Sequence, residues 1–134
     1  MADKKRVLII DDELEFLELM RIRISSWGYE VADASNGAEG IDILCSQKID
    51  IVVLDYIMPD MDGISVLREI RNVNAKVPVV MFTGYPDIRT QKEAEKLGVS
   101  VFVPKLSDYQ DVQNTLKSAL NIIQNNLNKE SKDK

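Results

Sequence analysis

Aspartates lie at two places where a run of apolar residues ends. Asp11 and Asp12 follow the apolar run 7–10, and Asp55 ends the run 51–55. If both runs are parallel strands of one sheet, their carboxyl ends meet at one edge and bring the three carboxylates together. Gathering like charges is costly, and a hard divalent cation with oxygen ligands is the usual remedy. Mg²⁺ fits because it needs few protein carboxylates and keeps positions open for water and phosphate.

Two further polar residues follow apolar runs later in the chain. Thr83 ends the run 79–83, and Lys105 comes shortly after the run 101–103. With a cation and Lys105 to neutralise the incoming charge, the Asp55 carboxylate can attack phosphorus, and Thr83 adds a hydroxyl donor. Taken singly, each residue has an ordinary structural role as a helix cap, a strand residue or a solvated lysine. Their common position at strand ends favours a phosphoryl-transfer site.

The elements that position these residues form an alternating pattern. Short apolar runs alternate with longer amphipathic segments, which is typical of a parallel sheet wrapped by helices. The predicted fold is α/β, a doubly wound five-stranded parallel sheet of order 2-1-3-4-5 with five helices. The predicted strands are residues 7–10, 29–32, 51–55, 79–83 and 101–103. The first, third and fourth runs are almost continuously apolar, so they are expected in the centre of the sheet.

Helix signals fall between the predicted strands. Gly28 follows the first helical stripe as a stop, Asn36 precedes the second helix, and Gly98 follows the fourth. Cys45 is expected to be a small core residue of the second helix. The predicted domain covers residues 4–127, and the polar segment 128–134 is expected to be a disordered tail.

Composition excludes several classes of function. The net charge is -5, which argues against direct nucleic-acid binding. The chain has no histidine, so histidine-based nucleophile systems, histidine metal sites and a phosphohistidine carrier are all excluded. No segment approaches the length of an apolar membrane helix. A single cysteine fits a reducing compartment, so we expect a cytoplasmic protein without membrane contacts.

Four segments together carry a resemblance to a known family. They read V-L-I-I-D-D-E, D-I-V-V-L-D-Y-I-M-P-D-M-D-G, P-V-V-M-F-T-G and V-F-V-P-K. Over about residues 4–127 the chain resembles receiver domains of response regulators, the phosphoacceptor proteins of two-component signalling and phosphorelays, which have a flavodoxin-like fold. The resemblance implies that Asp55 is the phosphoacceptor. It also implies a histidine kinase or a histidine phosphotransfer protein as the phosphodonor.

The resemblance also assigns roles to individual residues. It implies that Mg²⁺ is bound by Asp12, Asp55 and the backbone carbonyl of Ile57, with Asp11 acting through water. Thr83 and Lys105 are expected to hold the phosphoryl oxygens, and Phe102 to turn inward on activation. Phosphorylation is then expected to remodel the surface formed by the fourth helix, the fifth strand and the fifth helix, where a downstream protein binds.

The chain departs from the family pattern at one pair of residues. The family usually has Lys-Pro after the fifth strand, whereas here Pro104 precedes Lys105 and Leu106 follows it. A cis bond at Lys105–Leu106 would cost about 2.5–4 kcal/mol, so a trans bond is expected. The resemblance implies that hydrolytic water passes between the side chains of Ile57 and Tyr85. Because the first is branched and apolar and the second a large aromatic, they are predicted to lengthen the life of the phosphorylated state. Alternatively, Tyr85 points to solvent as part of a partner-binding surface.

Three functions remain open from the sequence. The leading hypothesis is a stand-alone phosphorelay switch that catalyses its own phosphorylation and dephosphorylation but is not a turnover enzyme. The second is a receiver fold used only for protein binding, without phosphorylation. The third is an aspartyl-phosphate phosphatase, which typically has D-x-D at the nucleophile, whereas residues 55–57 read D-Y-I and lack the second carboxylate.

Overall fold

A parallel sheet forms the centre of the molecule. The computed structural model describes residues 4–55, 63–83, 88–104 and 109–132. Within these ranges the sheet has five strands in the order β2-β1-β3-β4-β5, which confirms the predicted topology and the central position of β1, β3 and β4. The strands are β1 (Arg6–Ile10), β2 (Glu30–Ala34), β3 (Ile51–Asp55), β4 (Val79–Thr83) and β5 (Val101–Pro104).

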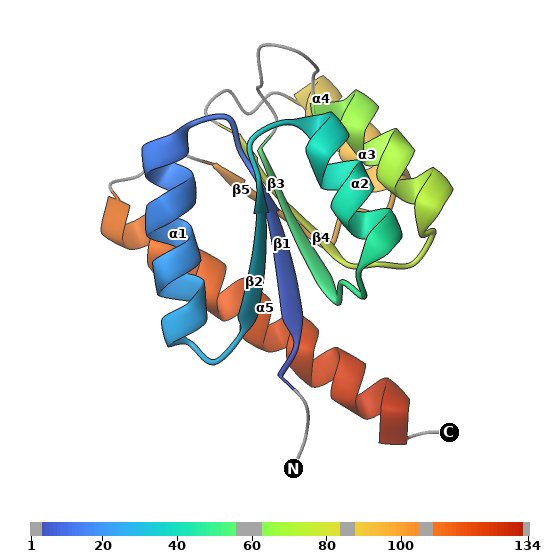
Figure 1. Cartoon of the computed structure of the whole chain (residues 1–134). Coiled ribbons are helices and arrows are strands. Elements are labelled where there is room, and N and C mark those ends of the chain that lie inside the picture. The colour runs from blue at the N-terminus through green and yellow to red at the C-terminus, as the bar shows by residue number, and fades with distance from the viewer. Residues whose placement is uncertain (1–3, 56–62, 84–87, 105–108, 133–134) are drawn as a thin grey trace.

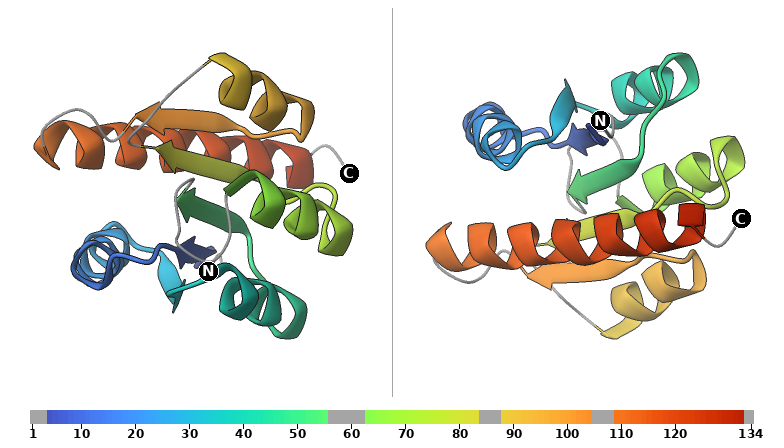
Figure 2. Two further views of the ribbon diagram at one scale, coloured as in Figure 1. Left: turned by 90° about the horizontal axis from the view of Figure 1, so that it is seen from above. Right: turned by 90° about the horizontal axis from the view of Figure 1, so that it is seen from below.

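Helices cover both faces of this sheet. They are α1 (Leu14–Ser26), α2 (Gly37–Ser46), α3 (Gly63–Val73), α4 (Ile88–Lys96) and α5 (Tyr109–Lys132). Figure 1 shows α1 on one side of the sheet and α2 with α3 on the other. Helix α5 packs on the α1 side and lies lengthwise beside β4 and β5 in the two views of Figure 2. Each strand runs toward the same edge, so all loops that follow a strand gather there.

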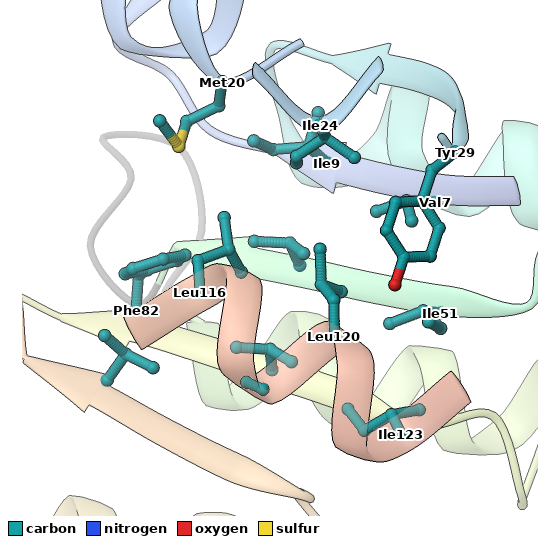
Figure 3. Packing of buried hydrophobic residues seen from close by; sticks show 14 of the residues in the cluster. Val7, Ile9, Met20, Ile24, Tyr29, Ile51, Phe82, Leu116, Leu120 and Ile123 are labelled. Carbon is teal, nitrogen blue, oxygen red and sulfur yellow. The ribbon is translucent and has the colours of Figure 1, made fainter. Parts of the chain in front are cut away.

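Side chains of alternate residues in the central strands pack into two separate hydrophobic cores, one on each face of the sheet. Val7 and Ile9 of β1 face α1 and α5, whereas Leu8 and Ile10 face α2, α3 and α4. Met20 and Ile24 of α1 belong to the same cluster as Leu116, Leu120 and Ile123 of α5, and both helices pack on this first face of the sheet (Figure 3). Period-two alternation of apolar side chains, buried on both faces, is what the continuous apolar runs predicted.

The second strand lies later in the chain than the sequence indicated. It was predicted at 29–32, but β2 begins at Glu30 and continues to Ala34, which pairs with Ile10 of β1. Asp33 lies within β2 and is exposed, because β2 is an edge strand where an exposed polar side chain is tolerated. Tyr29 belongs instead to the core of the α1 side.

Two expectations for helical segments differ from the structure. Cys45 was expected in the core, but it is exposed, because α2 turns Gly37, Gly40 and Leu44 toward the sheet. The tail was expected to begin at Asn128, but α5 continues to Lys132. Extending an existing helix adds one backbone hydrogen bond per residue without needing an apolar face, so polar residues suffice. In the described part of the chain, no helix combines the length and apolar character of a membrane span.

Candidate functional site

The three predicted aspartates meet at the carboxyl edge of the sheet. Ile10 and Leu54 are partners in the register of β1 and β3, so the residues that follow them, Asp11 and Asp55, lie side by side. Oxygen atoms of Asp11, Asp12 and Asp55 all lie within 4.8 Å of one another. The sequence prediction that separate strand ends bring these carboxylates together is therefore supported by the geometry.

Two of the three carboxylates in this cluster are buried. Asp11 is 1% exposed and Asp55 is 4% exposed, whereas Asp12 is half-buried. Charged carboxylates removed from water are destabilised unless a positive charge or hydrogen-bond donors compensate them. Carboxylate oxygens at this spacing are the ligands that a hard divalent cation prefers, and the open side at Asp12 leaves room for water ligands. The residues present therefore fit a magnesium site.

Asp11 also shapes the start of α1. Its Oδ1 accepts the backbone N–H of Glu13 at 2.9 Å, and its own N–H donates to the carbonyl of Ala34 at 3.1 Å. These bonds fix the turn between β1 and α1, which begins at Leu14. The positive end of the α1 dipole then lies next to the acidic cluster and favours its negative charge. A helix cap was among the ordinary roles weighed for an Asp at a strand end, and Asp11 takes a related role two residues before the N-cap residue Glu13.

An aromatic pair packs beside the phosphoacceptor candidate. Asp55 is the register partner of Phe82 in β4. The Phe82 ring meets Phe16 of α1 edge to face, with ring centroids 6.0 Å apart. Phe82 is buried and Phe16 is partly buried against the same cluster, so an apolar surface lies beside Asp55 on the α1 side.

The remaining predicted residues are only partly described. Thr83 is the last residue of β4, one position beyond the partner of Asp55, so its backbone reaches the same edge. Phe102 is half-buried and packs against the core on the side of α2, α3 and α4, where Met81 is its register partner. Lys105, Ile57 and Tyr85 lie outside the described residues, as does the Lys105–Leu106 bond, so their roles stay predictions.

The fold and the acidic cluster agree with comparisons to known proteins. A family model for the response regulator receiver domain matches residues 7–117. The chain belongs to this family. Receiver domains are the phosphorylation-responsive modules of two-component signalling, and the identification made from the four sequence segments is thereby confirmed.

The curated relatives of this receiver domain are longer proteins. The domain is 34% identical over 118 residues to the transcriptional regulatory protein ZraR of Escherichia coli K12, a match that covers 88% of this chain and 27% of ZraR. The chain thus spans about a quarter of that relative's length, and the expectation of a stand-alone protein stays a prediction.

Two solved structures with about 30% sequence identity to this chain have the same fold. A receiver domain protein from Clostridium thermocellum has a TM-score of 0.76 and 30% identity, covering 90% of this chain and 97% of that one. TrrA of Thermotoga maritima, solved in complex with Mg²⁺ and BeF, has a TM-score of 0.72 and 29% identity, covering 86% and 98% of the two chains.

Proposed function

We propose that this receiver domain accepts a phosphoryl group on Asp55 in a Mg²⁺-dependent reaction. The donor would be a phosphohistidine of a kinase or a phosphotransfer protein, because the chain has no histidine of its own. The observation that carries the proposal is the convergence of Asp11, Asp12 and Asp55 within 4.8 Å at one sheet edge. The Mg²⁺ complex of the related TrrA supports the choice of cation.

The chemistry follows from the position of Asp55. A carboxylate oxygen of Asp55 attacks phosphorus, the bond between phosphorus and the histidine nitrogen breaks, and the leaving nitrogen takes up a proton. Asp11, Asp12 and Asp55 would hold Mg²⁺, which when bound offsets the repulsion between Asp55 and the phosphoryl oxygens. The nearly complete burial of Asp55 restricts water on the protein side, so the acyl phosphate is shielded. Attack of water on phosphorus later returns the free carboxylate and inorganic phosphate.

The proposed output is a change in the surface formed by α4, β5 and α5. Thr83 ends β4 and Phe102 lies on the neighbouring strand β5, so a movement at the site can reach this surface through adjacent strands. A downstream protein would bind it in one state only. In this proposal the domain works stoichiometrically as a switch and is not a turnover enzyme.

Replacement of Asp55 tests the proposal most directly. With a small phosphodonor and Mg²⁺, we expect the wild type to gain one phosphoryl group by mass spectrometry and Asp55→Asn to gain none, because the amide is not a nucleophile for phosphorus. Removal of the cation with a chelator should also stop the reaction. Asp33→Asn, an exposed carboxylate on edge strand β2, is the matched control and should label like the wild type.

The other outcomes separate the alternatives. A label that persists in Asp55→Asn and maps to Asp60 or Asp62 would make the assignment of Asp55 wrong. A wild type that never gains mass would favour a receiver fold used only for binding. Continuous release of phosphate from a generic phosphomonoester would favour the phosphatase.

A further inference from the structure

Helix α4 has an unusually small apolar anchor. Of its residues, only Thr90 and Ala94 are buried, and its one large apolar residue, Ile88, is 72% exposed. Most stability of a surface helix in a domain comes from packing an apolar face. Helix α4 itself packs two small side chains, and Leu97 and Val99 just after it pack partly buried against the core, so polar contacts at this end add to a modest apolar attachment.

Arg71, in the last turn of α3, provides a polar attachment. Its Nε donates to the carbonyl of Leu97 at 2.6 Å, and its Nη2 donates to the carbonyl of Gly98 at 3.0 Å. Its Nη1 donates to the carbonyls of Val77 at 2.7 Å and Asn74 at 3.3 Å. We call this arrangement, one guanidinium and four backbone carbonyls, the Arg71 clamp. It joins the end of α3, the loop before β4 and the end of α4.

The clamp works through hydrogen bonds and not through an ion pair. Within the described ranges the salt bridges are Arg6–Glu30 and Arg68–Glu93, so no described carboxylate pairs with Arg71. Partial burial lowers the pKa of the Arg71 guanidinium, which nevertheless stays charged at neutral pH. Hydrogen bonds from a charged donor are shorter and stronger than neutral ones, and the planar guanidinium fixes their directions.

The end of α4 is shaped to receive these bonds. Gly98 has a φ of +77°, and the chain reverses there with the Gly98 N–H donating to Glu95 and the Val99 N–H donating to Ala94. This closing pattern satisfies carbonyls inside the last turn but leaves those of Leu97 and Gly98 pointing outward. Arg71 donates to both, so the two carbonyls that directly follow α4 are bonded to α3.

The clamp lies at the opposite edge of the sheet from Asp55. Helices α3 and α4 both start near the carboxyl ends of the strands and run back toward the amino ends, where Arg71 joins them (Figure 1). We propose that Arg71 is the positioning residue about which α4 pivots when Asp55 is phosphorylated. The inference rests on the proposed function and adds the pivot. The end of α4 next to Leu97 stays attached, and the end at Ile88, where Thr90 is the one buried side chain, moves.

A pivot of this kind gives the switch a defined direction. A helix fixed at one end can only swing, so a small push near Thr83 becomes a displacement that grows toward Ile88. Without the clamp, α4 would shift as a whole and its two ends would respond alike. The surface of α4, β5 and α5 would then differ less sharply between the two states.

Amide chemical shifts of the wild type give the first test. On adding fluoroberyllate with Mg²⁺, we expect changes at the Asp11 and Asp12 amides from occupation of the site. Along α4, the changes at residues 88–90 should exceed those at 97–99 by about threefold or more. Equal changes along the helix, with a filled site, would overturn the pivot and leave phosphorylation of Asp55 standing.

Variants on α3 give the second test. In Arg71→Met, amide hydrogen exchange at Gly98 and Val99 should rise by about tenfold or more, while β1 and β3 stay within about twofold of the wild type. The threefold gradient along α4 should fall to about one, while the phosphoryl gain at Asp55 persists. Arg68→Met is the matched control, because Arg68 lies on the same helix and makes only an exposed 3.7 Å pair with Glu93. It should keep the gradient.

The remaining outcomes also decide the matter. If Arg71→Met does not fold, Arg71→Lys keeps the charge but not the fork, and it should show a gradient between those of the wild type and a uniform response. An unchanged gradient in either variant would overturn the pivot. If fluoroberyllate causes no change at Asp11 and Asp12 in the wild type, the proposed function fails and the pivot with it.

Discussion

Helices α1 and α4 end in the same backbone pattern but are attached to the molecule by different forces. Gly28 after α1 has a φ of +99°, and Gly98 after α4 has a φ of +77°. In both, the residue after the glycine donates back into the last turn, Tyr29 to Ile24 and Val99 to Ala94. The difference between these helices therefore lies in what surrounds this shared ending.

Helix α1 is held by apolar burial along its whole length. Leu17, Met20 and Ile24 are buried at successive turns, and each fully buried side chain of this size stabilises the fold by roughly 1.5–3 kcal/mol. The shorter helix α4 buries only Thr90 and Ala94, and Arg71 bonds to the two residues that follow it. Moving α1 would expose a row of large side chains, whereas moving one end of α4 would expose almost none. In the proposed switch, the framework and the moving part would thus be distinguished by how much apolar surface each helix buries.

The largest effect should come from removing an apolar anchor of α1. Ile24 is 0% exposed, so Ile24→Ala should lower the free energy of unfolding by about 2–5 kcal/mol. On α4, Ala94→Gly removes one buried methyl group and adds the helix penalty of glycine, about 1–2 kcal/mol together. Urea denaturation followed by circular dichroism measures both losses.

An exposed residue of α1 serves as the control for this comparison. Ile22 is 51% exposed, so Ile22→Ala should change the free energy of unfolding by about 0.5 kcal/mol or less. Equal losses for Ile24→Ala and Ala94→Gly would contradict the view that the two helices are anchored differently.

The parts that sequence could predict are those fixed by apolar continuity and by strand direction. The runs 51–55 and 79–83 are β3 and β4 with the predicted bounds. Strands that are buried on both faces are apolar at every position, so a short continuous apolar run marks their whole length. Convergence of Asp11 and Asp55 followed from parallel strands alone. In contrast, edge strand β2 was misplaced, because a half-exposed strand carries a weaker pattern.

The Arg71 clamp was beyond reach of the sequence analysis for a physical reason. Its acceptors are backbone carbonyls, which every residue possesses, and two of them are 26 and 27 residues further along the chain. Side-chain type and spacing carry no record of such bonds. The position of Cys45 failed for a related reason: two helical faces were compatible with its spacing, and Gly40, which lies against Ile10, decided between them.

An intermediate effect is expected from the buried phenol at the end of α1. Tyr29 is buried, its hydroxyl donates to Gln124 Oε1 at 3.0 Å, and burial raises its pKa above the ordinary value of 10.0. Below the ordinary pKa of 10.0, which applies to the unfolded chain, the folded and the unfolded protein both keep the Tyr29 proton, so the free energy of unfolding is unaffected by this group. Above that pKa the unfolded chain loses the proton first, so stability falls as the pH rises toward the raised pKa.

Removal of the hydroxyl separates this contribution from other alkaline effects. Tyr29→Phe should cost about 0.5–1.5 kcal/mol near neutral pH through the lost hydrogen bond. Between about pH 8 and about pH 11 it should lose less stability than the wild type does. Urea denaturation across this range measures both curves, and parallel curves for the two proteins would show that Tyr29 does not titrate with unfolding.

The smallest effect should come from the charged contact at the end of α1. Lys117 of α5 places its Nζ 6.0 Å from the centroid of the Trp27 ring. Such a contact at an exposed site is worth about 0.5–1 kcal/mol, so Lys117→Gln should lower the free energy of unfolding by no more than that. Trp27 is the only tryptophan, and its fluorescence reports both the denaturation curve and a local change of environment.

The control comes from the corresponding turn of α4. Lys96 is exposed in the last turn of α4, and Lys96→Gln should change the stability by less than about 0.5 kcal/mol without altering Trp27 fluorescence. A loss of about 2 kcal/mol or more in Lys117→Gln would mean that a cation holds the end of α1 as Arg71 holds the end of α4. The two helices would then share their mode of attachment, and apolar burial would no longer explain why α4 swings in the proposed switch and α1 does not.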